Sequence, residues 1–155
     1  MTTASMQDNA TDTAPGRLPQ TQVAIAIDTA YVASVGSGTI GAGAYMMDNR
    51  VQLCSQSEGQ LELTTCCPVG QEIGFTVYPI DLGSGDTVAI TGFNVSAGDV
   101  FGSSGYPKKQ GGSGNYWVGK AQNQGSQTYQ IQVTVTPGSG GGPYYINWDP
   151  FINAV

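Results

Sequence analysis

The feature that most constrains the fold is an alternation of apolar and polar residues that recurs along the chain in short runs. In "TYQIQVTVTP", residues 128–137, Tyr129, Ile131, Val133 and Val135 face one way and the hydroxyl and amide side chains between them face the other. This period of two is typical of a strand with one buried and one exposed face. The runs "VAIAID", "GQLELTT", "QEIGFTVYPI" and "DTVAITGFNV" repeat the pattern between turn residues.

These runs predict an all-β fold. No window of 11 residues shows the i, i+3, i+4, i+7 apolar spacing of an amphipathic helix. We therefore expect an antiparallel β-sandwich or jelly roll of about eight strands in residues 22–155. Residues 1–21 are polar and punctuated by proline, which predicts a flexible N-terminal arm.

The charge of the chain argues against several classes of partner. Only 10% of the residues are charged and the net charge is -6, with five basic residues in all. Roughly a quarter of the residues in an ordinary globular domain are charged. So few basic side chains cannot neutralise a run of phosphates, and we expect neither nucleic-acid binding nor binding to an anionic membrane. No run is apolar enough to predict insertion into a membrane.

The sequence offers no catalytic, cofactor-binding or metal-binding constellation. The absence of histidine excludes Ser-His-Asp and Cys-His catalysis and removes the commonest zinc ligand. The run Gly36 to Gly41 matches a dinucleotide fingerprint, but no helical pattern follows it. Nothing in the spacing of Asp28 and Asp149 shows that these carboxylates meet. We expect a protein that is not an enzyme, without cofactor or metal.

The three cysteines, Cys54, Cys66 and Cys67, form no recognisable framework. Cys66 and Cys67 are adjacent and would point to opposite faces of a strand, so a bond between them would be strained. We predict three free thiols in a reducing cytosol and hence a cytoplasmic protein.

The chain ends on an aromatic stretch, "YYINWDPFINAV", that is either a closing strand of the core or an adhesive surface for a partner. As a strand it would place Tyr144, Ile146 and Trp148 on the inner face. Pro150 would stop the hydrogen-bond ladder, because proline has no amide proton. Asp149 would accept hydrogen bonds from the amides of a neighbouring turn.

A glycine-rich segment at residues 101–117 is a second candidate surface. Tyr106, Tyr116 and Trp117 lie in or next to it, and aromatic side chains on such loops can stack on sugars. This segment therefore suggests a lectin-like glycan-binding module as an alternative function.

Two motifs, one near each end of the chain, resemble the PixA/AidA inclusion-body protein family of bacteria. Its members typically open with I-D-T-x-Y-[IV] and close with [YF]-x-W-D-P-[YF]-[IV]. The residues that match here are Ile27, Asp28, Thr29, Tyr31 and Val32, then Tyr145, Trp148, Asp149, Pro150, Phe151 and Ile152.

The resemblance implies a β-sandwich that associates with itself and carries no known catalytic residue. Low charge and strand faces rich in hydroxyl and amide groups agree with that implication, because little like-charge repulsion keeps copies apart. We therefore predict a non-enzymatic protein that assembles into intracellular inclusions, crystals or filaments. Assembly would use either packing of faces or exchange of the N-terminal arm between copies.

Overall fold

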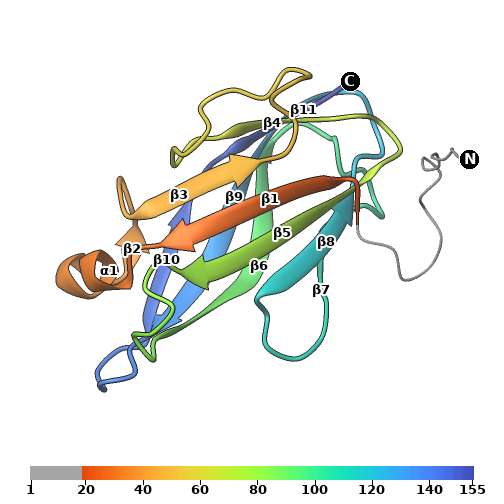
Figure 1. Ribbon diagram of the computed structural model, residues 1–155. Helices are drawn as coiled ribbons and strands as arrows, with labels where there is room; N and C mark the ends of the chain where they lie inside the picture. The colour runs from red at the N-terminus through yellow and green to blue at the C-terminus, as the bar shows by residue number, and fades with distance from the viewer. Residues whose placement is uncertain (1–18) are drawn as a thin grey trace, which may run out of the picture.

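The structure is a computed structural model that describes residues 19–155, and it consists of two β-sheets and one short helix (Figure 1). The elements in chain order are β1 (Thr21–Ile27), α1 (Thr29–Val35), β2 (Gly38–Thr39), β3 (Ala44–Asp48), β4 (Thr64–Cys67), β5 (Glu72–Pro79), β6 (Thr87–Ala97), β7 (Lys108–Lys109), β8 (Tyr116–Lys120), β9 (Gly125–Thr136), β10 (Tyr144–Trp148) and β11 (Phe151–Ala154). The predicted all-β class is confirmed.

The first sheet has the strand order β3-β1-β5-β8-β7. Its central pair, β1 and β5, is parallel, with Val23 opposite Phe75, and the other pairs are antiparallel. The inner side chains of β1 and β5 are fully buried, as the alternation in their sequences requires.

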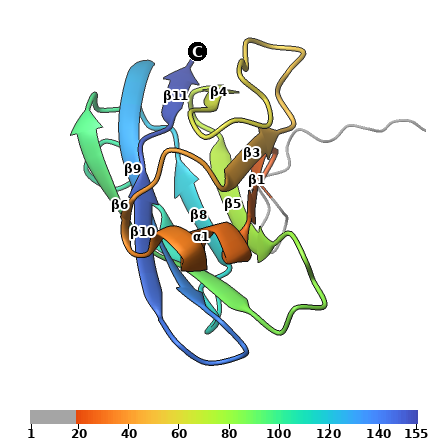
Figure 2. The same ribbon diagram turned by 90° about the vertical axis from the view of Figure 1, so that its left-hand side faces the viewer.

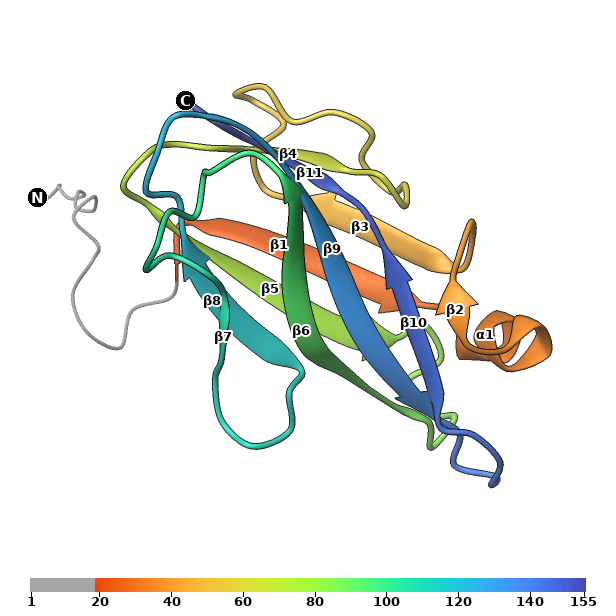
Figure 3. The same ribbon diagram turned by 180° about the vertical axis from the view of Figure 1, so that it is seen from behind.

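The second sheet is organised around β9, which pairs with β6 along one side and with β10 and β11 along the other. Figure 3 shows β6, β9 and β10 side by side, seen from behind. The short strands β2 and β4 pair in parallel with β10 and β11 respectively.

β10 and β11 keep one register against β9 although Asp149 and Pro150 interrupt them. Trp148 lies opposite Ile131, and three residues later Phe151 lies opposite Thr128. Pro150 therefore interrupts the ladder, as expected, but does not end it. The missing amide proton breaks the pairing locally, but the ladder resumes at the next residue.

The two sheets face each other across a single hydrophobic core (Figure 2). Aromatic rings join the layers: the ring centroid of Phe75 lies 5.8 Å from that of Tyr129 and 4.9 Å from that of Phe93. Burial raises the pKa of the Tyr129 hydroxyl far above its usual value, because ionisation would place a charge in this apolar interior.

Three expectations about the fold need correction. The fold is not wholly antiparallel, because three strand pairs are parallel, and it has eleven strands rather than about eight. Apolar alternation shows that a strand has two faces, but it carries no information about the direction of the neighbouring strand. The helix α1 was also missed, because seven residues are too few for a periodic apolar stripe.

The predicted N-terminal arm, residues 1–21, lies almost entirely outside the described residues. β1 begins at its last residue, Thr21. Exchange of the arm between copies therefore stays a prediction.

The terminal stretch is confirmed as a strand of the core. Ile146 and Trp148 are buried and Tyr144 packs against the core, whereas Tyr145 is 61% exposed on the opposite face. The adhesive-surface alternative therefore does not apply to Trp148.

Replacing Trp148 with alanine is expected to lower the free energy of unfolding by about 3–5 kcal/mol, because the indole ring would leave a cavity in the core. Tyr145→Ala is the matched control. It removes a neighbouring aromatic ring from the solvent face and should cost less than about 1 kcal/mol. Urea denaturation followed by circular dichroism measures both, and equal losses in the two variants would contradict the assignment of the two faces.

Candidate functional site

The first motif, at residues 27–32, builds the cap of helix α1. The carboxylate of Asp28 accepts a hydrogen bond from the backbone N–H of Tyr31 at 3.0 Å, and Asp28 is the N-cap residue. An aspartate in this position satisfies an amide that the helix itself leaves unpaired. The Tyr31 ring lies against Gly43, where a Cβ atom would collide with the ring. Asp28 thus has the structural role of a hydrogen-bond acceptor at the end of a strand.

Thr29, the next residue of this motif, joins the helix to two loops through Asp86. The hydroxyl of Thr29 donates a hydrogen bond of 2.6 Å to the Asp86 carboxylate, which also accepts from the backbone N–H of Gly138 at 2.8 Å. The hydrogen bond from Thr29, followed by that from Gly138, holds the pKa of Asp86 below its usual value. Asp86 thereby fixes the start of α1 and the loops that follow β5 and β9.

The second motif, at residues 145–152, lies in the core of the second sheet. The indole N–H of Trp148 donates to the sulfur of Met46 in the first sheet at 3.2 Å. The carbonyl of Pro150 accepts from the backbone N–H of Tyr129 at 3.1 Å, and Phe151 is half-buried. Both motifs therefore support the fold.

Asp149 does not behave as expected. Its Oδ1 atom is buried and has no hydrogen-bond partner among residues 19–155, so the prediction that this carboxylate accepts from a neighbouring turn is wrong.

The three aromatic residues proposed for glycan contact are not brought together. Tyr116 and Trp117 are neighbours on β8 and face opposite ways. Trp117 turns inward, with its ring centroid 5.5 Å from that of Phe93, whereas the Tyr116 hydroxyl accepts from the side chain of Gln22 at 3.3 Å. Tyr106 is 41% exposed and stands in a separate groove. The predicted long loop also contains β7, which pairs with β8.

That groove, called the lysine groove below, has a volume of about 250 Å³ and opens on the outer side of β7 and β8. Its walls include Glu72, Tyr106, Lys108, Val118, Lys120 and Gln122.

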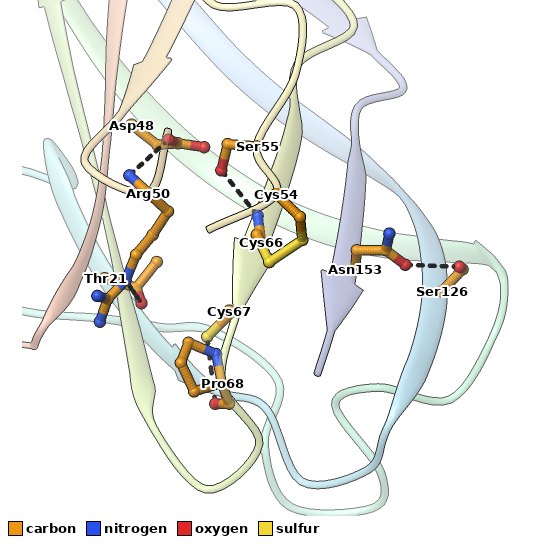
Figure 4. Close-up of a disulfide and its surroundings, with 10 residues drawn as sticks. All are labelled: Thr21, Asp48, Arg50, Cys54, Ser55, Cys66, Cys67, Pro68, Ser126 and Asn153. Carbon is orange, nitrogen blue, oxygen red and sulfur yellow. Dashed lines mark hydrogen bonds between the residues drawn. A yellow bond between two sulfur atoms is a disulfide. The ribbon is translucent and has the colours of Figure 1, made fainter. Parts of the chain in front are cut away.

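The cysteine prediction is wrong for two of the three residues. Cys54 and Cys66 form a disulfide bond, and Cys67 is a free, buried thiol (Figure 4). The strand alternation expected for Cys66 and Cys67 is present, since Cys67 belongs to the hydrophobic core and Cys66 turns to the loop that holds Cys54. The sequence could not show this pairing, because it depends on how residues 49–63 fold back over β4. Burial raises the pKa of the Cys67 thiol.

The same loop creates a carboxylate pair that the sequence analysis missed. The backbone N–H of Asp48 donates to Oε1 of Glu58 at 2.8 Å, while Oδ2 of Asp48 and Oε2 of Glu58 are buried without a partner. Removal from water, followed by the contact with the Asp48 carboxylate, raises the pKa of Glu58. Within the described residues, no group of three or more acidic or cysteine side chains is placed to hold a metal ion.

The outer side of the second sheet carries a continuous network of uncharged polar side chains. Gln130 on β9 accepts from Asn94 on β6 at 3.2 Å and from Gln132 at 3.3 Å, and it donates to Asn147 on β10 at 3.5 Å. Asn147 also accepts from Thr39 on β2 at 2.7 Å. We call this surface the amide face and define it by Thr39, Thr91, Asn94, Gln130, Gln132, Tyr145 and Asn147.

The amide face is free of charge over its whole width. None of the six strands that form the second sheet contains an aspartate, glutamate, lysine or arginine. A shallow hollow of about 270 Å³ lies at its centre, lined by Thr91, Gln132, Tyr145 and Asn147 among others. Sequence alternation in β9 indicated one such polar strand. The network across four strands was visible only once their order was known.

Comparison with known protein families identifies residues 19–140 with the family described as "Domain of unknown function (DUF8788)". The chain belongs to this family. The DUF8788 match includes the first motif and ends before β10, so the second motif lies beyond it. No curated protein matches the chain.

The present chain shares its fold with an inclusion body protein, PixA, from Burkholderia cenocepacia J2315. Their structures superpose with a TM-score of 0.75 at 18% sequence identity, over 87% of this chain and 94% of the other. At this identity the likeness shows the fold alone. The resemblance to the PixA/AidA family is thus supported at the level of architecture, and membership of that family stays a prediction. None of the helices in residues 19–155 is long and apolar enough to cross a membrane.

Glu58→Gln is expected to stabilise the protein at neutral and mildly alkaline pH. The amide keeps the acceptor for the Asp48 N–H and adds a donor for the unpartnered Asp48 oxygen. Because the folded pKa of Glu58 is raised, its contribution to stability is complete below the unfolded value of 4.5 and is lost as the pH rises through the folded value. Between pH 4 and 8, the free energy of unfolding should therefore change less with pH for Glu58→Gln than for the parent. Glu62→Gln, an exposed position, is the control, and an equal change in both variants would contradict the pairing.

Cys54→Ser is expected to lower the free energy of unfolding by about 3 kcal/mol, because the disulfide closes a loop with a sequence separation of 12. A reductant should lower the free energy of unfolding of the parent to that of Cys54→Ser and leave the value for the variant unchanged. Alkylation of the native, unreduced parent should leave Cys67 unmodified, because its thiol is buried and protonated. Recovery of three alkylated cysteines from unreduced protein would refute the bond.

Proposed function

We propose that this chain is a non-enzymatic protein that associates with copies of itself to form intracellular inclusions, crystals or filaments. The observation that carries the proposal is the amide face, a broad sheet surface without a single charged residue. On most protein surfaces, dispersed charges keep copies apart. Here that repulsion is absent, and the hydroxyl and amide groups provide donors and acceptors for a second copy.

The composition of the face suits a protein interface. Interface centres are depleted in charged residues and enriched in tyrosine. Tyr145 is 61% exposed next to the central hollow, and it is the one large aromatic side chain of the amide face. The hydrogen bonds between Gln130, Gln132 and Asn147 hold these side chains in place before association, which reduces the entropy that binding must remove.

The name of the structurally similar protein supports the same proposal. The PixA protein from Burkholderia cenocepacia is described as an inclusion body protein, and it has this fold. We extend that description to the present chain on the basis of the amide face, and we place the inclusions in the cytoplasm. The Cys54–Cys66 bond removes the argument for the cytoplasm that rested on three free thiols, since cytosolic reductants keep most thiols reduced. The location therefore rests on the inclusion-body description of the similar protein.

A lectin-like module is the second candidate. The observation in its favour is the exposed ring of Tyr106 in a polar groove of about 250 Å³. Tyr116 and Trp117 contribute nothing to that groove, so a sugar would stack on one ring only.

The test places a charge of either sign on the amide face. Thr91→Lys and Thr91→Glu are each expected to weaken self-association at least about tenfold, because either charge would have to leave water when two faces meet. Sedimentation velocity and light scattering of the purified full chain over a range of concentrations measure the effect. A parallel titration with a panel of glycans tests the lectin-like candidate.

Gln52→Lys and Gln52→Glu are the matched controls, at an exposed position outside the amide face. Lysine lowers the net negative charge and glutamate raises it, so a simple effect of net charge would move the two variants in opposite directions. Unaltered association in both Thr91 variants would remove the amide face from the proposal. A strictly monomeric parent that binds a glycan would replace self-association with the second candidate.

A further inference from the structure

Three of the four basic side chains of the described residues lie at one edge of the first sheet, and the fourth, Arg50, contacts Thr21 and Gln71 elsewhere. The three lysines of the chain all lie on β7 and β8: Lys108, Lys109 and Lys120. None of them forms an ion pair within residues 19–155. Lys108 and Lys120 line the lysine groove, where the one acidic neighbour is Glu72, opposite Lys120 in the strand register. In a chain of net charge -6, this groove is a local basic site.

The lysine groove has an apolar wall and lies on closely packed backbone. Tyr106 packs against Phe101, with ring centroids 5.5 Å apart, and presents its other side to solvent. The backbone beneath is tightly packed, because a Cβ atom on Gly105 would collide with the carbonyl oxygens of Lys120 and Phe101. Val118, opposite Lys108 in the strand register, adds a second apolar side chain to the lining. The groove thus suits a ligand that is both apolar and negatively charged.

The loop between β5 and β6, residues 80–86, has the complementary character, and we call it the acidic knob. Leu82 at its tip is 77% exposed and Ile80 is 51% exposed. Asp81 stands between them, also exposed, and its Oδ1 atom accepts only the backbone N–H of Gly83 in the same turn. The knob therefore presents two apolar side chains around one carboxylate.

The acidic knob is held in shape before any contact. Asp86 anchors its end through the hydrogen bonds from Thr29 and Gly138 described above, and the backbone N–H of Ser84 donates to the carbonyl of Asp81 at 3.1 Å. Asp86 is thus already engaged, which leaves Asp81 as the carboxylate available to a partner. A preformed loop loses little entropy when it binds.

The knob cannot reach the groove of its own chain. Glu72, at the groove, begins β5, and Pro79, next to the knob, ends it. At about 3.3 Å per residue these ends are roughly 23 Å apart. Figure 1 shows the end of β8 and the loop after β5 at opposite ends of the molecule.

We propose that the acidic knob of one copy docks into the lysine groove of the next copy, with Leu82 against Tyr106 and Val118 and with Asp81 between Lys108 and Lys120. This inference rests on the proposed self-association and names a second contact for it. The two surfaces differ and lie at opposite ends of β5, so the contact is heterologous and can repeat from copy to copy. It builds an open filament where the rotation between copies does not close a ring. The amide face lies on the other sheet and stays free to join filaments side by side.

Charge reversal and complementation test the contact. Lys120→Glu and Asp81→Lys should each weaken association at least about tenfold, because each places like charges across the interface. An equimolar mixture of the two variants should associate again, since each knob then meets a groove of opposite charge. Light scattering at low salt measures the effect, and association of the parent should weaken as salt is added.

Lys109→Glu is the matched control, because it makes the same charge change on β7 outside the groove lining. Circular dichroism establishes that each variant is folded. Parent-like association of Lys120→Glu and Asp81→Lys, or a mixture that stays dispersed while both are folded, would overturn the knob-and-groove contact and leave the amide face in place. A parent that never associates would overturn the proposed function itself.

Discussion

The whole molecule depends on the alternation of side chains along β9. This strand of twelve residues pairs with β6 on one side and with β10 and β11 on the other, so it fixes the register of most of the second sheet. Its inner residues, including Tyr129 and Ile131, fill the core, while Gln130 and Gln132 hold the amide face together. A shift of one residue would exchange the two sets, placing amides in the core and apolar rings in water. One sequence period therefore sets both the stability of the domain and the chemistry of its exposed surface.

Much of this arrangement could be predicted from the sequence, because burial leaves a direct mark on residue type. The inward positions of Ile146 and Trp148 followed from alternation alone, and so did the opposite directions of Cys66 and Cys67. Strand direction left no such mark, since β1 and β5 look alike whether they run parallel or antiparallel. Helix α1 escaped notice because Asp28 and Gly43 specify it through a cap and a close contact, and not through a periodic stripe.

The candidate sites were harder to predict because they depend on residues that are distant in the chain. The aromatic residues Tyr116 and Trp117 are adjacent in sequence, and strand geometry is the reason that they separate. Asp48 and Glu58, in contrast, meet only because the loop after β3 folds back, and the same loop brings Cys54 to Cys66. To predict that the lysines and the acidic knob lie at opposite ends of the molecule, one likewise needs the direction of β5 in the sheet. Composition indicated low charge, but the topology decides where that charge lies.

The interruption at Asp149 and Pro150 has a consequence for how copies of this protein can aggregate. It divides one long strand into β10 and β11, and each half is covered by a very short partner, β2 or β4. This side of the sheet therefore ends in two short edge strands, which expose few unpaired backbone groups to an added strand. On the opposite side β6 is a longer edge strand of 11 residues, but two irregularities in its register against β9 make that edge less regular. Neither side therefore offers the long, flat edge strand that favours edge-to-edge aggregation. Particles built through folded surfaces instead would contain native molecules and would redissolve reversibly on dilution, as a protein crystal does.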